Sequence, residues 1–170
     1  MTERPSTRTP TWQILDVAHD DPRAKALRRQ LDADLGARYD GFHGDEPPER
    51  KAARSRALAL HPDEIVATLI AVDAEGTPAG HVILRRLGAE WELKRLVVAS
   101  THRGRGIARG LVAAVVERAR AGGAARVILQ TGLQQPESIR LYETAGFTRI
   151  PVYEPYGETM PRSVCFELVL

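Results

Sequence analysis

Arg103-Gly104-Arg105-Gly106-Ile107-Ala108 joins an apolar run at residues 93–99 to an amphipathic run at residues 107–121. The first run predicts a strand, and the second predicts a helix because its apolar residues recur at helical spacing. Free backbone N–H groups and the helix dipole at such a helix start favour an anion, and glycines let the anion approach closely. We therefore expect this loop to bind the pyrophosphate of a nucleotide-like cofactor.

Positive charge is concentrated in this loop and in the helix after it. Residues 103–126 hold six arginines and one acid, Glu117. A solvated helix face is the alternative interpretation of that charge. The whole chain has 24 Lys and Arg residues against 22 Asp and Glu residues, a net charge of +2. This balance indicates neither a nucleic-acid partner nor a membrane partner.

The composition is that of an ordinary soluble protein. With 170 residues, 43% apolar and 27% charged, the chain is long enough for one domain with a real core. We expect a flexible tail at residues 1–10 and a single domain at residues 11–170. The one cysteine, Cys165, excludes an intrachain disulfide and lies in an apolar run. No apolar run approaches a membrane span and no signal segment is present, so we expect a cytoplasmic protein.

The order of the predicted elements indicates an α+β fold. Three β-rich runs, residues 64–73, 78–87 and 90–99, follow one another through tight turns and predict an antiparallel meander. The third run leads through the glycine loop into the predicted helix and then a strand at 125–131, which implies a parallel crossover. The remaining expected elements are strands at 12–17, 147–151 and 163–170, and helices at 22–37, 51–60 and 136–145. We thus predict three layers: a mixed sheet, in which a βαβ unit follows the meander, with helices on both faces.

Three nucleotide-binding patterns compete for the loop. A P-loop requires G-x-x-x-x-G-K-[ST], and the chain contains no such string. A dinucleotide fingerprint, G-x-G-x-x-G, fits Gly104 and Gly106 but has Arg109 at its third glycine. The meander before the loop also disfavours a nicotinamide-dependent enzyme. The third pattern, R/Q-x-x-G-x-G/A, is matched at every fixed position by Arg103, Gly106 and Ala108.

A second motif lies further along the chain, at Leu141-Tyr142-Glu143-Thr144-Ala145-Gly146-Phe147. It resembles the L-Y-x-x-x-G-F signature of the GNAT superfamily of acetyl-CoA-dependent N-acetyltransferases, to which the loop and the meander are also similar. The resemblance covers roughly residues 60–170. It implies a GNAT-like mixed sheet, acetyl-CoA as co-substrate, and a primary amine on a small molecule or a protein as acceptor.

The resemblance also implies which residues bind the cofactor. The pantetheine arm would lie along the strand before the loop and bond the backbone of Leu96 and Val98, with the thioester carbonyl near Leu96 or Val97. A bulge in this strand would help to open the gap for it. The pyrophosphate would meet the loop, and Gln135 stands where many members carry an Asn that contacts cofactor or backbone. The implied loop residues are Arg103, Gly104, Arg105, Gly106, Ile107, Ala108 and Arg109.

Tyr142 corresponds to the tyrosine that protonates the leaving thiolate in the family, and packing of its ring in the core is the alternative. Gln130 stands where some members carry a catalytic Glu, so the general base lies elsewhere or is water. Glu92 is the first candidate, followed by His61 and His81. The five histidines show no metal-ligand spacing, so we expect no metal.

Three features leave alternatives open. The segment between the last two strands either lines the acceptor pocket or covers the sheet edge as a proline-rich hairpin. A non-catalytic acyl-CoA-binding sensor on the same fold is the alternative function. The resemblance also allows a homodimer formed through sheet edges. The candidate acceptor-side residues of the segment are Tyr153, Glu154, Tyr156 and Glu158.

Overall fold

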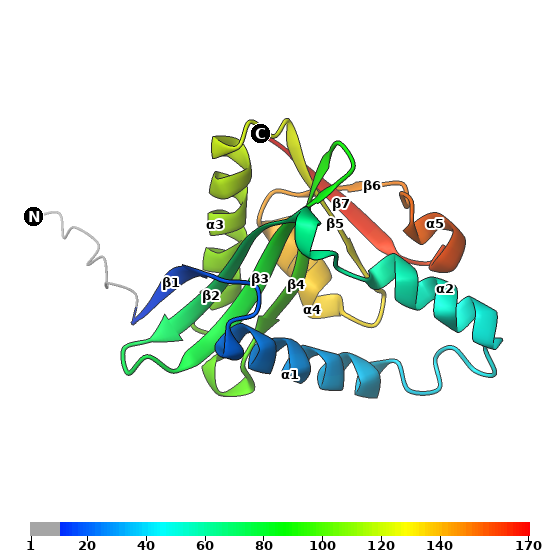
Figure 1. The fold of residues 1–170 in the computed structure, drawn as a ribbon, viewed down its shortest axis with the longest axis horizontal. Helices are drawn as coiled ribbons and strands as arrows, with labels where there is room; N and C mark the ends of the chain where they lie inside the picture. The colour runs from blue at the N-terminus through cyan, green and yellow to red at the C-terminus, as the bar shows by residue number, and fades with distance from the viewer. Residues whose placement is uncertain (1–10) are drawn as a thin grey trace, which may run out of the picture.

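Residues 11–170 are described by the computed structural model, and their seven strands form one mixed sheet (Figure 1). The strand order is β1-β2-β3-β4-β5-β7-β6, and of these pairs β4 with β5 is parallel while the others are antiparallel. The strands are β1 (Trp12–Val17), β2 (Ile65–Asp73), β3 (Pro78–Leu87), β4 (Glu90–Val98), β5 (Arg126–Thr131), β6 (Thr148–Ile150) and β7 (Val164–Val169). The predicted meander and βαβ unit are therefore confirmed. The tail predicted at residues 1–10 lies outside the described residues.

Helices cover both faces of the sheet, as predicted. On one face, the buried stripe of α3 packs with Tyr142 of α4 against β2 to β5. On the other face, Ala24 and Leu27 of α1 pack against Ile70 and Val97. Full burial of a side chain such as Leu27 contributes roughly 1.5–3 kcal/mol. The helices are α1 (Pro22–Arg38), α2 (Pro48–Leu58), α3 (Ile107–Ala121), α4 (Pro136–Thr144) and α5 (Tyr156–Thr159), with 3₁₀ turns at Pro62–Glu64 and Ser100–His102.

Local sequence signals explain the helix starts. The Asp21 carboxylate accepts a hydrogen bond from the Arg23 N–H at 2.9 Å, and Pro22 occupies the first position of α1. Helix α2 begins three residues earlier than predicted, because Pro48 is suited to the first helical position. Helix α5 was not predicted, since four residues are too few to show a helical period.

A bulge interrupts β4, as the resemblance led us to expect. His81 pairs with Val97 while Ile83 pairs with Lys94, so two residues of β4 face one residue of β3. Arg95, in the bulge, has a φ of 57°, which is strained for a residue with a side chain. The buried His81 holds it there, because its Nδ1 donates to the Arg95 carbonyl at 2.8 Å.

Candidate functional site

Strands β4 and β5 separate part of the way along their length. Their parallel ladder ends at the Leu93–Leu129 pair, although β4 continues to Val98 and β5 to Thr131. A cavity of about 870 Å³ opens at this point, within the usual range for small-molecule sites. It is lined from the two strands by Leu93, Lys94, Arg95, Leu96, Gln130 and Thr131. The gap expected in front of the loop is thus present.

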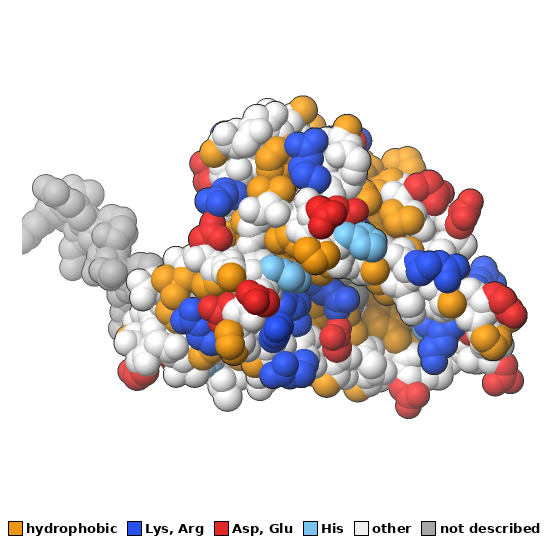
Figure 2. Space-filling model, in the orientation of Figure 1, with side chains coloured by type: hydrophobic (Ala, Val, Ile, Leu, Met, Phe, Trp, Pro, Cys, Tyr) orange, Lys and Arg blue, Asp and Glu red, His pale blue; other side chains and the backbone are white. Residues whose placement is uncertain are grey.

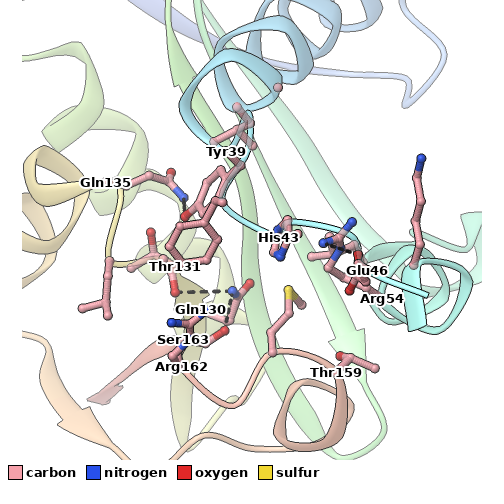
Figure 3. A pocket seen from close by; sticks show the side chains of 18 of the residues that line it. Tyr39, His43, Glu46, Arg54, Gln130, Thr131, Gln135, Thr159, Arg162 and Ser163 are labelled. Carbon is pink, nitrogen blue, oxygen red and sulfur yellow. Dashed lines mark hydrogen bonds and ion pairs between the residues drawn. The ribbon is translucent and has the colours of Figure 1, made fainter. Parts of the chain in front are cut away.

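The other walls of the cavity come from segments far apart in the sequence. Tyr39 and His43 follow α1, and Arg54 projects from α2 (Figure 3). Phe42, between Tyr39 and His43, also lines the cavity. The opposite wall is made by Gln135 and Tyr142 of the α4 region and by residues 159–163. Figure 2 shows basic side chains around the hollow between α1 and α2.

The end of α1 meets the loop after β5 at one rim of the cavity. The Gln135 Nε2 donates to the Tyr39 hydroxyl at 3.3 Å, and the Arg38 Nη1 donates to the Gln134 carbonyl at 3.1 Å. The Tyr39 hydroxyl lies against Gly132, where an added Cβ would overlap it. Gln135 therefore lines the cavity, but its amide is engaged by Tyr39, and its contact with a cofactor stays a prediction.

Tyr142 packs in the core, the alternative that its sequence position allowed, and its acid role stays a prediction. Its ring packs on Phe147 and Phe166, with centroids 5.8 and 6.0 Å apart, and the residue also lines the cavity. Burial raises the pKa of the Tyr142 phenol above its usual value, so the hydroxyl keeps its proton at neutral pH.

The glycine loop has free donors and open space above its backbone. Gly104 and Gly106 have φ of 75° and 76°, and a Cβ on either would meet no atom within 4 Å. In the part of the chain that the structure describes, no backbone N–H of residues 104–109 donates a hydrogen bond. Arg103 is exposed and pairs with Asp34 of α1 at 3.1 Å. The loop thus has the donors that an anion requires.

The remaining candidate cofactor residues lie outside the cavity lining. Arg105 Nη2 lies 3.4 Å from the Thr101 carbonyl, while Arg109 is exposed. The Val97 side chain is buried toward α1, and Val98 pairs with β3. Ile107 and Ala108 begin α3, with the Ile107 side chain in the core. Their backbone contacts with a cofactor stay predictions.

Glu92 is held in a buried network rather than exposed to the cavity. It is 0% exposed, and its Oε2 accepts from the Arg85 Nε at 2.6 Å. Its Oε1 accepts from the hydroxyls of Tyr153 and Tyr156, each at 2.8 Å. Burial and the neighbouring Glu92 charge raise the pKa of both phenols. The role of Glu92 as a base stays a prediction, and it has no direct contact with the cavity.

The segment between β6 and β7 lines the cavity, but not through the four candidate acceptor-side residues. Tyr153 and Tyr156 are turned toward Glu92, and the cavity is lined instead by residues 159–163. The four candidates absent from the lining are Tyr153, Glu154, Tyr156 and Glu158. The position of Tyr156 depends on α5, a helix that the sequence did not predict.

Lys94 is a cavity residue that the sequence analysis missed. It is 6% exposed, its Nζ donates to the Tyr156 hydroxyl at 2.8 Å, and burial lowers its pKa to about 8. The sequence does contain a sign of it: Glu92 and Lys94 are two residues apart, which places two charges on one face of an apolar strand. By contrast, the base candidate His61 is exposed and outside the cavity lining.

The other base candidate, His81, also lies outside the lining of the cavity. Its Nδ1 donates to the Arg95 carbonyl, and its Nε2 accepts from the Arg28 Nη1 at 3.1 Å. Burial lowers its pKa to about 4. Both ring nitrogens are therefore engaged away from the site.

Two further properties bear on the site. Among residues 11–170, no three His, Cys, Asp or Glu side chains are grouped so that they could hold a metal ion. None of the helices in the same range is long and apolar enough to cross a bilayer.

Comparisons with known proteins agree with this geometry. The profile of the acetyltransferase (GNAT) family matches residues 28–147. N-acetyltransferase family 8 member 2 of Rattus norvegicus is 34% identical over 130 residues, which make up 76% of this chain and 50% of that protein. IAA acetyltransferase of Azospirillum brasilense is 36% identical over 78 residues, 46% of this chain and 51% of that protein. The chain thus spans about half the length of these curated relatives.

Solved structures share the fold. A Klebsiella pneumoniae protein assigned as an acyl-CoA N-acyltransferase has a TM-score of 0.74 at 26% identity, covering 95% of this chain and 99% of that one. A GNAT family acetyltransferase from Elizabethkingia anophelis, solved with acetyl-CoA bound, has a TM-score of 0.65 at 15% identity, covering 95% and 100%. The second likeness concerns the fold alone. Because the family profile matches well over half of its residues, this chain belongs to the GNAT family of acetyltransferases.

Proposed function

We propose that this protein transfers an acetyl group from acetyl-CoA to a primary amine. The observation that carries the proposal is the end of the β4–β5 ladder, where the cavity opens beside β4. An extended chain of amides can add to such a strand through main-chain hydrogen bonds. In this proposal the pantetheine arm bonds the backbone of Leu96 and Val98, and the thioester carbonyl lies near Leu96 or Val97. Family membership supports the same donor.

The glycine loop would hold the pyrophosphate at the carboxyl end of β4. The free N–H groups of residues 104–109 and the positive end of the α3 dipole both favour an anion. Gly104 and Gly106 leave the space that close approach of a phosphate requires. Arg103 would exchange the exposed carboxylate of Asp34 for a phosphate oxygen.

The proposed reaction is a direct acyl transfer. The amine nitrogen attacks the thioester carbon, the C–S bond breaks, and the sulfur leaves as a thiolate. Tyr142 donates its phenolic proton to that sulfur, since burial keeps the phenol protonated until then. The proton that the amine loses restores the phenol through solvent, so the exchange of protons balances.

Glu92 can take part in removing the proton from the amine only indirectly. Its carboxylate already accepts three hydrogen bonds, two of them from the Tyr153 and Tyr156 hydroxyls. A proton would therefore reach it through one of these hydroxyls, or pass to water in the cavity. In the first case Glu92 acts through another group, in the second it takes no part, and in neither does it touch the acceptor.

Turnover of acetyl-CoA with a panel of primary amines, followed by release of free thiol, tests the proposed function. We expect Tyr142→Phe to lose about 10²- to 10⁴-fold in kcat while its affinity for CoA is kept. The matched Tyr39→Phe variant removes a hydroxyl from the rim of the same cavity and should cost far less. Unchanged turnover in Tyr142→Phe would exclude the acid role of Tyr142.

A non-catalytic acyl-CoA sensor is the alternative function, and the engagement of Glu92 in a buried network favours it. Such a sensor would bind acetyl-CoA with the affinity of an enzyme and release no thiol with any amine. The same preparation of protein decides between the two, because binding and thiol release are measured separately.

A further inference from the structure

The ammonium group of Lys94 is buried in the wall of the cavity and has N–H groups that donate no hydrogen bond within the described part of the chain. The residue lines the cavity and is 6% exposed. Among residues 11–170, the Tyr156 hydroxyl alone accepts a hydrogen bond from the Lys94 Nζ, although an ammonium group carries three N–H donors. A buried N–H donor is costly when nothing accepts its hydrogen bond. Lys94 is therefore a candidate for contact with a ligand.

The buried network next to Lys94 is organised by a second cation, Arg85. Arg85 pairs with Glu92 at 2.6 Å and with Glu64 at 3.1 Å. The Tyr156 hydroxyl, which Lys94 contacts, also accepts from Arg85 and donates to Glu92. Within residues 11–170, no carboxylate forms an ion pair with Lys94. Glu92 is a nearby negative charge but accepts none of the Lys94 N–H groups, so the unused donors of Lys94 match an anion that is not part of this network.

The rest of the lining has more basic than acidic side chains. Arg54 pairs with Glu46 at 3.0 Å, and Arg95 pairs with Asp32 outside the cavity at 2.5 Å. Arg162 lies 4.9 Å from the centre of the Phe42 ring and has no ion pair among the described residues. The charged lining residues are Arg50, Lys51, Arg54, Lys94, Arg95 and Arg162 on the basic side and Asp40, Asp45 and Glu46 on the acidic side. Such a lining disfavours a polyamine and favours an amine that carries an anion.

We propose that the acceptor is an amino acid with a free α-carboxylate, and that Lys94 binds this carboxylate. The inference rests on the proposed function, because it names the substrate class of the same cavity. Lys94 precedes Leu96 by two residues across the bulge, and both residues line the cavity. A carboxylate bound to Lys94 would keep the α-amine, which is one carbon away, on the side of the cavity where the thioester is expected. Phe42 and Met160 give the side chain of the amino acid an apolar surface.

Matched pairs of acceptors test this assignment. L-Phenylalanine and 2-phenylethylamine share a ring and an amine, and differ in the carboxylate, as do L-leucine and 3-methylbutylamine. We expect kcat/KM to be about tenfold or more higher for the amino acid of each pair. Lys94→Met should remove this preference by lowering kcat/KM for the amino acids about 10- to 100-fold, while the two plain amines change less than about threefold. Equal losses for both members of a pair would overturn the assignment.

Two further variants separate charge from structure. Lys94→Gln keeps a donor for the Tyr156 hydroxyl but has no charge, so it should lose the preference as Lys94→Met does. Lys25→Met removes an exposed lysine of α1 outside the cavity, and should keep the preference. Thermal unfolding confirms that each variant is folded before it is assayed. A Lys94→Gln variant that keeps the full preference for amino acids would also overturn the assignment.

Binding without turnover keeps the two proposals distinguishable. CoA carries no acetyl group, so amino-acid binding can be measured in its presence without turnover. Titration calorimetry is carried out with amino-acid concentrations up to about 10 mM, which is above the usual range of KM. We expect L-phenylalanine to bind the wild-type protein and to bind Lys94→Met at least about tenfold more weakly. Binding with this difference but no acetyl transfer refutes the proposed function alone. Failure of the wild-type protein to bind the amino acid, or transfer without preference, refutes the role of Lys94.

Discussion

Acidification should destabilise this protein through His81, the residue that holds the bulge in β4. His81 is buried and neutral, with Nδ1 donating to the Arg95 carbonyl and Nε2 accepting from Arg28. Burial is the main cause that lowers its pKa from 6.5 to about 4, and the charges of Arg28, Arg95 and a protonated His19 act in the same direction. In the unfolded chain, the same imidazole takes up a proton at its ordinary pKa.

The size of the effect follows from the two pKa values. Between pH 6.5 and about 4 the unfolded chain binds the proton and the folded chain does not, so the free energy of unfolding falls as the pH falls. At about 1.4 kcal/mol for each pH unit, the full loss is about 3 kcal/mol. At about pH 5, roughly 2 kcal/mol of it is already lost. Above pH 6.5 both states are neutral, and His81 contributes no pH dependence there.

Urea unfolding of the wild type and of a His81→Asn variant, each at about pH 7.5 and about pH 5, measures this loss of unfolding free energy. Asn can still donate to the Arg95 carbonyl but does not titrate, so its loss between the two pH values should be smaller than that of the wild type by about 2 kcal/mol. His61→Asn, at an exposed site, should behave as the wild type does. Equal losses in the wild type and His81→Asn would refute the reasoning.

Two other predictions concern the loop and the buried network. Gly106→Val forces a side chain into a φ of 76°, so it should lower the free energy of unfolding by about 1–2 kcal/mol and weaken CoA binding. The control Gly76→Val, at a φ of 83° in the β2–β3 turn, should lower stability by a similar amount and leave CoA affinity unchanged. If calorimetric titration gives equal CoA affinities for the two variants, the pyrophosphate does not bind at the loop. Glu92→Gln removes the main counter-charge of the buried Arg85, so it should lower the free energy of unfolding, measured in urea, by about 3–5 kcal/mol. The control Glu90→Gln, at the half-exposed pair with Arg126, should lower it by about 1 kcal/mol or less. Wild-type stability in Glu92→Gln would show that the ion pair does not stabilise the fold.

The sequence predicted the order of the elements well, because each left a local trace. Alternating or continuous apolar runs marked β2, β3 and β4, and the helical spacing of Ile107, Leu111 and Val115 marked α3. Turn residues separated these elements, so β3 and α3 were predicted with the same bounds as the structure has. The loop from Arg103 to Ala108 and the motif around Tyr142 were found for the same reason, since their spacing is fixed within a few residues.

What the sequence could not provide was the set of partners around the site. The insertion of β7 between β5 and β6 depends on pairing between strands distant in the chain, and α5 depends on the packing of Tyr156. The burial of Glu92 follows from these contacts, since Arg85, Tyr153 and Tyr156 come from two other segments. The sequence by itself therefore determined the family, the glycine loop and the candidate donor, because local spacing encodes them. Only the tertiary structure decided that Glu92 is enclosed and that the ammonium of Lys94 lines the cavity, because burial and hydrogen-bond partners are set by contacts between distant segments.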